Sequence, residues 1–343
     1  MINKDSYSKS TMSALNSILV TGGAGYIGSV LTKKLVENRY KVRILDSAIY
    51  GLSGISQFVD NKNVELILGD VRNEEIIRKS VKDIDCIIHL AAIVGEPLCN
   101  KIPEAARQIN EFATKKLVTI SKSEGVRRFV FASTCSNYGS SETPVNETSQ
   151  LQSLSLYSET KVKSESFVMS SKDPDFEPCV LRFATAFGLS PRMRFDLLLQ
   201  EFIRDAVVNK KIAVFGPHYW RPLVHVDDIS NACIKAISSS AEKISGQVYN
   251  VGSNDQNYTK LDLAKIIQNF IPDITIEIQE LKKDPRNYRV SFDKITHNLQ
   301  FKITKTVKDG VSEILEKIRN GKLDPRESEF SNMSKLTEKV QVY

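Results

Sequence analysis

A glycine-rich turn near the start of the chain constrains the fold more than any other feature. The turn reads TGGAGYIG over residues 21–28, between an apolar run at 18–20 and a stretch with apolar residues at helical spacing at 27–35. This order of strand, tight turn and helix is typical of a dinucleotide-binding βα unit. The glycines let the backbone approach a pyrophosphate, and the helix N-terminus favours an anion. The alternative for such a pattern alone is an ordinary βα turn.

Asp46 favours a particular cofactor. It closes the next apolar run, residues 42–45, eighteen residues after Gly28. A carboxylate at this point binds the ribose hydroxyls and repels a 2′-phosphate. No basic residue follows it immediately. The sequence therefore predicts NAD rather than NADP.

Further short apolar segments predict a parallel sheet. They lie at residues 64–68, 86–89, 128–133 and 180–183, with helix-like stretches between them. This alternation predicts an α/β fold with a doubly wound parallel sheet.

Ligands of such sheets bind at the carboxyl ends of the strands, where several polar or small residues fall. We expect Asp70 and Val71 to contact the adenine, and the small Ala91 and Ala92 to let the cofactor pass close to the backbone. The alternative for each of these residues is an ordinary strand end. The residues predicted to bind the cofactor are Gly22, Gly25, Tyr26, Ile27, Gly28, Asp46, Asp70, Val71, Leu90, Ala91, Ala92, Asn110, Ser133, Tyr157 and Lys161.

Tyr157, Lys161 and Thr134 are the predicted catalytic residues. Tyr157 and Lys161 are four residues apart in a predicted helix, so they share one face. An isolated tyrosine has a pKa of about 10, and a nearby ammonium and an oxidised nicotinamide both favour its phenolate. Thr134 would offer a hydroxyl to the same substrate oxygen. These groups suit redox chemistry on an alcohol; a surface helix pair is the alternative for the tyrosine and lysine alone.

The motifs together resemble those of the extended short-chain dehydrogenase/reductases, and within them the nucleotide-sugar epimerase/dehydratase branch. The resemblance covers residues from about 16 to about 317. It implies a Rossmann domain that holds NAD, a smaller mixed α/β C-terminal lobe that binds the nucleotide of an NDP-sugar, and a homodimer. The motifs are TGGAGYIG, Asp46, Gly69-Asp70, HLAA at 89–92, STCSNYG at 133–139, YSETK at 157–161 and RPLVHVDD at 221–228.

The two residues after Thr134 bear on the type of reaction. Dehydratases and decarboxylases of this branch carry an acidic residue there, and this chain has Cys135 and Ser136. Dehydration and decarboxylation by those routes are therefore disfavoured. Relatives similar to fucose synthase use a cysteine for proton transfer, but their cysteine aligns with Ser136. We interpret Cys135 as a packing residue, with a catalytic part as the alternative.

Substrate contacts follow from the same resemblance. Relatives usually have an asparagine where this chain has Thr185, so the resemblance does not identify the sugar of the substrate. Arg221 matches an arginine that binds the nucleotide diphosphate, and Arg286 is a second candidate, since guanidinium groups suit phosphate geometry. Arg192 and Arg194 form a cationic cluster, for which solvated surface is the alternative. The predicted substrate-binding residues are Cys135, Ser136, Thr185, Arg194, Arg221 and Arg286.

The predicted domains interleave. Residues 16–185 and about 222–252 are expected to form the Rossmann domain, and residues 186–221 and 253–320 the nucleotide-sugar lobe. Residues 1–15 and 323–343 are expected to be loosely held ends.

The amino-acid composition narrows the kinds of partner that the chain is expected to bind. The net charge is +6, but 41 acidic residues are interspersed with the basic ones, so no nucleic-acid partner is expected. The five cysteines form no CxxC pair and the four histidines have no metal spacing, which predicts reduced thiols, a cytoplasmic location and no metal. No apolar stretch has membrane-spanning length.

The favoured function is an NAD-dependent nucleotide-sugar 4-epimerase. Tyr157 would remove the hydroxyl proton, hydride would pass from C4 to NAD, and it would return to the other face of the keto sugar. An NDP-4-keto-sugar reductase is the enzymatic alternative, marked by net NAD(P)H consumption. A cofactor-binding regulator of the same fold is the non-enzyme alternative; such relatives tend to lose the tyrosine or the lysine.

Overall fold

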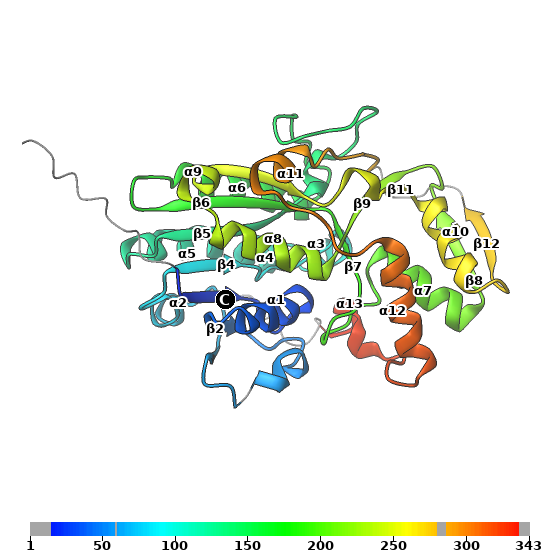
Figure 1. Ribbon diagram of the computed structural model, residues 1–343, viewed down its shortest axis with the longest axis horizontal. Helices are drawn as coiled ribbons and strands as arrows, with labels where there is room; N and C mark the ends of the chain where they lie inside the picture. Colours follow the sequence, from blue (N-terminus) through cyan, green and yellow to red (C-terminus); the bar gives the residue numbers. More distant parts are fainter. Residues whose placement is uncertain (1–14, 59, 280–285, 336–343) are drawn as a thin grey trace, which may run out of the picture.

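A seven-stranded parallel sheet forms the centre of the molecule (Figure 1). The computed structural model describes residues 15–58, 60–279 and 286–335. The strand order is β10-β6-β5-β4-β1-β2-β3, which is a doubly wound arrangement and confirms the predicted fold class. The strands are β1 (Ser17–Thr21), β2 (Lys41–Asp46), β3 (Val64–Leu68), β4 (Cys86–His89), β5 (Arg128–Thr134), β6 (Glu177–Phe183) and β10 (Gln247–Val251).

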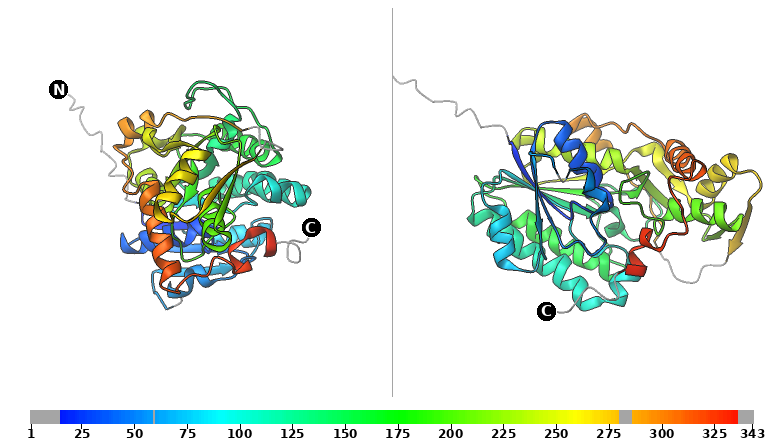
Figure 2. Two further views of the ribbon diagram at one scale, coloured as in Figure 1. Left: turned by 90° about the vertical axis from the view of Figure 1, so that its right-hand side faces the viewer. Right: turned by 90° about the horizontal axis from the view of Figure 1, so that it is seen from below.

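Most of the sheet is buried on both faces, whereas the edge strand β3 leaves Leu66 and Leu68 exposed. The right-hand view of Figure 2 shows helices on either side of the sheet. Alternate residues of β1 point to opposite cores: Ile18 and Val20 pack in one, and Leu19 packs in the other. This explains why the strands read as continuous apolar runs. The first core contains residues of α1 (Tyr26–Glu37) and α8 (Val226–Ser238), and the second contains residues of α2 (Glu74–Val81), α5 (Ala113–Ser123) and α6 (Leu156–Ser170).

A smaller lobe lies beside the carboxyl ends of these strands, on the right in Figure 1. It has its own apolar core and two small sheets, one of order β11-β9-β7 and one of β12 with β8. Its strands are β7 (Thr185–Phe187), β8 (Lys211–Phe215), β9 (Trp220–His225), β11 (Asn257–Thr259) and β12 (Thr275–Gln279), and its main helices are α7 (Leu198–Asn209), α10 (Lys260–Phe270) and α12 (Val307–Arg319).

The chain passes between the two parts more than once. β9 pairs in the small sheet with β7 and β11, whereas β10 pairs with β6 in the central sheet. The division into two domains remains a prediction. Residues 222–225, which it assigns to the Rossmann domain, pair with β7 and β11 in the small sheet. The shorter elements are η1 (Ser53–Phe58), α3 (Glu96–Lys101), α4 (Pro103–Arg107), the π-helix η2 (Gln108–Phe112), η3 (Cys135–Tyr138), α9 (Ala241–Ile244), η4 (Asn254–Gln256), α11 (Asp293–Leu299), η5 (Ser328–Phe330) and α13 (Asn332–Lys335).

The C-terminal segment, residues 323–335, corrects one expectation. Its composition suggested a loosely held end, but the Phe195 N–H donates to the Phe330 carbonyl over 2.8 Å and Asn332 is buried. Phe330 packs against the apolar core of the smaller lobe, and this contact holds a segment whose composition is mostly polar. Residues 1–14 and 336–343 of the two predicted ends lie outside the described residues.

The helices, the potential metal ligands and the cysteines bear on the partners predicted from the composition. None of the helices in residues 15–335 that the structure describes combines the length and the apolar character needed to cross a membrane. Across the same described ranges, no group of three or more potential metal-ligating side chains is found. All five cysteines are free and buried.

Candidate active site

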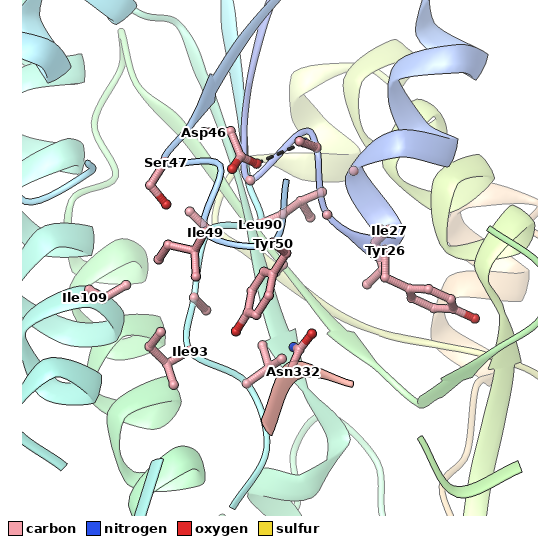
Figure 3. A pocket seen from close by; sticks show the side chains of 18 of the residues that line it. Tyr26, Ile27, Asp46, Ser47, Ile49, Tyr50, Leu90, Ile93, Ile109 and Asn332 are labelled. Atoms are coloured by element: carbon pink, nitrogen blue, oxygen red, sulfur yellow. Dashed lines mark hydrogen bonds between the residues drawn. The ribbon is translucent and has the colours of Figure 1, made fainter. Parts of the chain in front are cut away.

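A cavity of about 200 Å³ opens at the carboxyl ends of β1, β2, β4 and β5 (Figure 3). It brings together residues from both parts of the chain, as expected for a doubly wound sheet. Those predicted from the sequence that line it are Gly22, Gly25, Tyr26, Ile27, Gly28, Asp46, Asp70, Val71, Leu90, Ala91, Ala92, Ser133, Tyr157, Lys161 and Arg194. Those that do not line it are Asn110, Thr134, Cys135, Ser136, Thr185, Arg221 and Arg286.

The glycine turn forms a cradle that only glycine fits. Gly22 has a φ of +74°, and a Cβ there would lie 2.9 Å from the Ala91 backbone nitrogen. A Cβ on Gly28 would lie 2.2 Å from the Gly22 carbonyl oxygen. Helix α1 begins after Gly25 without a side-chain cap, so its first N–H groups are left for a ligand. This cradle fits a pyrophosphate.

Asp46 connects β2 to the glycine turn. One carboxylate oxygen accepts the Ala24 N–H over 2.9 Å, and the other accepts the Ala48 N–H over 2.8 Å. Burial raises the pKa of Asp46, and these two hydrogen bonds oppose the rise. Figure 3 shows the carboxylate at the cavity wall, in the position predicted for a ribose ligand.

Asp70 lines the cavity but is already paired. Its carboxylate contacts the Arg72 guanidinium over 2.6 Å and accepts the Arg72 N–H over 2.8 Å. The ion pair fixes the side chain at the end of β3. A contact with adenine remains a prediction.

Two predicted cofactor ligands have other roles. The Tyr26 ring points away from the cavity (Figure 3), because its hydroxyl donates to the Gly188 carbonyl over 2.7 Å and accepts from Gln200 over 2.9 Å. Asn110 is buried outside the cavity lining, and its amide hydrogen-bonds the N–H and carbonyl of Ile93. Tyr26 thus joins α1 to the smaller lobe, and Asn110 positions Ile93, which lines the cavity. Tyr26 lines the cavity although its hydroxyl is engaged in the smaller lobe, and Asn110 lies outside the lining, so a cofactor contact of either residue remains a prediction.

Two of the three predicted catalytic residues line the cavity, and the third, Thr134, is hydrogen-bonded to one of them, Tyr157. Tyr157 and Lys161 come from α6 and line it, and Thr134 ends β5 beside them. Burial raises the pKa of Tyr157, while the Arg194 charge and a hydrogen bond with Thr134 oppose the rise. Arg194, distant in sequence, therefore belongs to the electrostatic surroundings of this hydroxyl.

Lys161 has its own backbone partner. Its Nζ donates to the Ala132 carbonyl oxygen over 2.7 Å and lies 4.6 Å from the centre of the Phe131 ring. Burial lowers the pKa of Lys161 to about 8. The helical spacing correctly places Lys161 at the same cavity as Tyr157.

Ser133 is held by a buried polar network. Its hydroxyl donates to Glu165 over 2.7 Å and accepts from Asn137 over 3.1 Å. Glu165 in turn forms an ion pair with Arg182. Ser133 reaches the cavity wall with its hydroxyl already committed to this network.

Cys135 and Ser136 lie outside the cavity lining. Cys135 is 1% exposed, its thiol donates to the Arg182 carbonyl oxygen over 3.3 Å, and burial raises its pKa. This burial agrees with the packing interpretation, and a contact of Cys135 with substrate remains a prediction. Ser136 hydrogen-bonds the Tyr288 hydroxyl instead.

The remaining predicted substrate residues lie outside the cavity lining. Arg221 is buried, and its guanidinium donates to the carbonyl oxygens of Trp220 and Arg286 over 2.7 and 2.5 Å. Arg286 lies 4.0 Å from a Glu96 carboxylate oxygen. Thr185 lies on β7 beside Ala186, which does line the cavity. Their contacts with substrate remain predictions.

Sequence reasoning missed about half of the lining. Many of these residues neighbour predicted ones, but Tyr50, Arg192 and Asn332 come from loops and the C-terminal segment, which carry no motif. The pairing of Arg192 with Arg194 in a cationic cluster was the sequence feature that pointed to Arg192 as a site residue. The missed residues are Ala24, Leu45, Ser47, Ile49, Tyr50, Gly51, Gly69, Ile93, Val94, Ile109, Ala132, Phe183, Ala186, Arg192, Leu197 and Asn332.

A family model described as the NAD dependent epimerase/dehydratase family matches residues 18–252. The chain belongs to this family. The match spans the glycine turn, the tyrosine–lysine pair and β10, so it covers the whole cofactor cavity except the C-terminal segment. Because the family is NAD dependent and the cradle fits a dinucleotide, NAD is the cofactor.

Relatives in the family carry out different reactions. A putative UDP-glucose 4-epimerase of Methanocaldococcus jannaschii is 26% identical, over 88% of this chain and 98% of its own length. UDP-glucuronic acid decarboxylase 1 of Danio rerio is also 26% identical, over 87% of this chain and 72% of its own. The structure of UDP-glucuronic acid 4-epimerase from Bacillus cereus, in complex with UDP-glucuronic acid and NAD, superposes with a TM-score of 0.80 at 26% identity, covering 89% of this chain and 99% of that one.

Proposed function

We propose that the protein is an NAD-dependent nucleotide-sugar 4-epimerase. The observation that carries this proposal is the placement of Tyr157 and Lys161 at the cofactor cavity, with Thr134 hydrogen-bonded to Tyr157 and followed by a Cys135 that is buried and donates to a backbone carbonyl. The site thus has a group for the alcohol proton and lacks the groups for elimination at that position.

NAD would be held by the glycine cradle, by Asp46 and by Lys161. When bound, NAD takes up a hydride from the sugar carbon and returns it. The chain itself positions the dinucleotide through the free N–H groups of α1 and the carboxylate of Asp46.

Tyr157 would carry the proton of the sugar hydroxyl. Its buried hydroxyl favours the protonated form in the cofactor-free protein, because burial penalises the phenolate. The opposing charge of Arg194 and the hydrogen bond with Thr134 already lie in place. A positive nicotinamide nearby adds to that opposing effect, so loading with NAD makes Tyr157 a better proton acceptor.

Elimination would require a carboxylate beside Thr134, and the nearby ones are engaged. Glu165 pairs with Arg182, and Glu147 accepts the Asn250 N–H over 2.8 Å. Both lie close enough to influence the pKa of Cys135. Each therefore already has a partner within the fold, which supports epimerisation over dehydration.

The substrate proposal is an NDP-sugar held between the central sheet and the smaller lobe. Relatives named for UDP-glucose and UDP-glucuronic acid support a nucleotide sugar. Arg194 lines the cavity on the lobe side and pairs with Asp196 over 2.9 Å. Action as a cytoplasmic homodimer stays a prediction.

A substrate panel tests the function. Purified protein is incubated with UDP-, GDP-, CDP- and dTDP-sugars without added NAD(P)H, and NMR reads the product stereochemistry. We expect interconversion of one 4-epimeric pair. Turnover that requires stoichiometric NAD(P)H would replace the proposal by a 4-keto-sugar reductase, and absence of any turnover across the panel would support a cofactor-binding regulator.

A further inference from the structure

Three polar side chains in the cavity have a buried atom without a hydrogen-bond partner. They are the Tyr50 hydroxyl, Nη2 of Arg192 and Oδ1 of Asn332. Arg192 and Asn332 are each 4% exposed. Buried polar atoms are nearly always paired, so three unpaired ones around one cavity indicate that a polar ligand completes them.

Arg192 lies beside the glycine cradle. A Cβ placed on Gly54 would be 2.7 Å from the Ala24 carbonyl oxygen and 3.0 Å from Cβ of Arg192, so these three segments meet. The Arg192 guanidinium stacks 4.5 Å from the centre of the Tyr50 ring. Burial, aided by Arg194, lowers the pKa of Arg192 to about 10, which leaves it cationic at neutral pH. A buried cation and the glycine cradle therefore line the same cavity.

The C-terminal segment brings Asn332 to the same cavity. The rings of Phe330 and Phe195 pack edge to face at 6.0 Å, next to the backbone hydrogen bond that joins them. The Asn332 N–H donates to Asp196 over 3.1 Å. These contacts fix the backbone of the segment without using the Asn332 side chain, which Figure 3 shows projecting into the cavity near Tyr50.

We propose that the C-terminal segment completes the NAD site as a strap that slows release of the cofactor. Arg192 would donate to the pyrophosphate, and Oδ1 of Asn332 would accept a hydrogen bond from a hydroxyl or amino group of the dinucleotide. Both contacts satisfy atoms that are otherwise unpaired. The inference rests on the NAD dependence of the family and is independent of which sugar reacts.

The experiment measures release of NAD from the full-length protein by rapid filtration, with no sugar present. Asn332→Ala should release NAD about fivefold to tenfold faster, as expected for one lost hydrogen bond. Phe330→Ala should also speed release, because it loosens the docking of the segment on Phe195. Met333→Ala is the matched control: its side chain is on the same segment, 37% exposed and outside the cavity, so release should match the wild type.

Arg192→Met tests the second contact. Loss of a charge-assisted hydrogen bond to a phosphate should weaken NAD affinity about tenfold or more by titration calorimetry. Wild-type affinity in this variant would overturn the assignment of Arg192.

Folding is checked by thermal unfolding without NAD. If Asn332→Ala is unstable, the nearly isosteric Asn332→Leu decides, because it keeps the backbone bond to Asp196 and removes the side-chain acceptor; it too should release NAD faster. Wild-type release rates in a folded Asn332 variant overturn the strap. Failure of the 4-epimerase proposal would leave these rates unaffected, so the two outcomes are distinguishable.

Discussion

Lys161 donates a hydrogen bond from Nζ to the Ala132 carbonyl oxygen over 2.7 Å, which ties α6 to the carboxyl end of β5. The same end of β5 carries Thr134, and α6 also carries Tyr157. One buried ammonium thus fixes the relative position of the two elements that supply the proposed proton-handling groups.

The buried ammonium predicts a pH dependence of stability. The pKa of Lys161 is about 8 in the fold against 10.5 for a free lysine, so between these values the unfolded chain binds more protons. Stability contributed by this site therefore rises with pH across that window. The free energy of unfolding of cofactor-free wild type, relative to Lys161→Met, should increase by roughly 2–3 kcal/mol from pH 7 to pH 10. Urea unfolding of both proteins at both pH values measures it; a pH-independent difference would contradict the assignment.

Tyr157→Phe should lower turnover by about 10²–10⁴-fold while NAD affinity and folding are retained, because only a proton-transferring hydroxyl is removed. Tyr138→Phe is a matched control: its hydroxyl is buried between Arg182 and Asn250, outside the cavity. That variant should lose stability and keep most of its turnover. Near-normal turnover of Tyr157→Phe, read by NMR on the best substrate, would remove Tyr157 from the mechanism.

Asp46→Ala should shift the NAD/NADP affinity ratio towards NADP by about tenfold, because a negative charge near the ribose is lost. The positive charge of Arg192, close enough to lower the pKa of Asp46, then acts unopposed on a 2′-phosphate. Asp46→Asn should shift the ratio similarly but destabilise the protein less, since it keeps an acceptor for the Ala24 N–H. Calorimetric titration with both cofactors decides it, and an unchanged ratio in both variants would count against Asp46 as the ribose ligand.

Epimerisation in deuterated water should leave the carbon-bound hydrogens of the sugar in place. Transient oxidation at C4 exchanges no carbon-bound hydrogen with solvent, whereas dehydration and 3,5-epimerisation pass through carbanion-like states that do. Mass spectrometry and NMR of the product locate any deuterium. Deuterium at C5 or C3, or a 4-keto-6-deoxy product, would overturn the epimerase proposal and reopen a catalytic role for Cys135.

Much of the fold was predictable from local patterns. The strands β1, β2, β4, β5 and β6 were visible as apolar runs, because a strand buried on both faces is mostly apolar. The glycine turn was equally visible, because its backbone approaches leave no room for a Cβ at Gly22 or Gly28. The tyrosine–lysine pair followed from helical spacing. These features depend on residues close together in sequence.

The tertiary structure alone decided which side chains face the cavity. Tyr26 sits within the glycine motif yet turns to Gly188 in the smaller lobe, and Cys135 follows Thr134 yet packs on Arg182. Asn332 reaches the cavity on a segment whose Phe330 docks on Phe195, 135 residues away in sequence, and Arg192 reaches it from a loop that meets Tyr50. Local sequence sets backbone geometry over a few residues, whereas the direction and partners of a buried polar side chain depend on segments that meet only when the chain has folded.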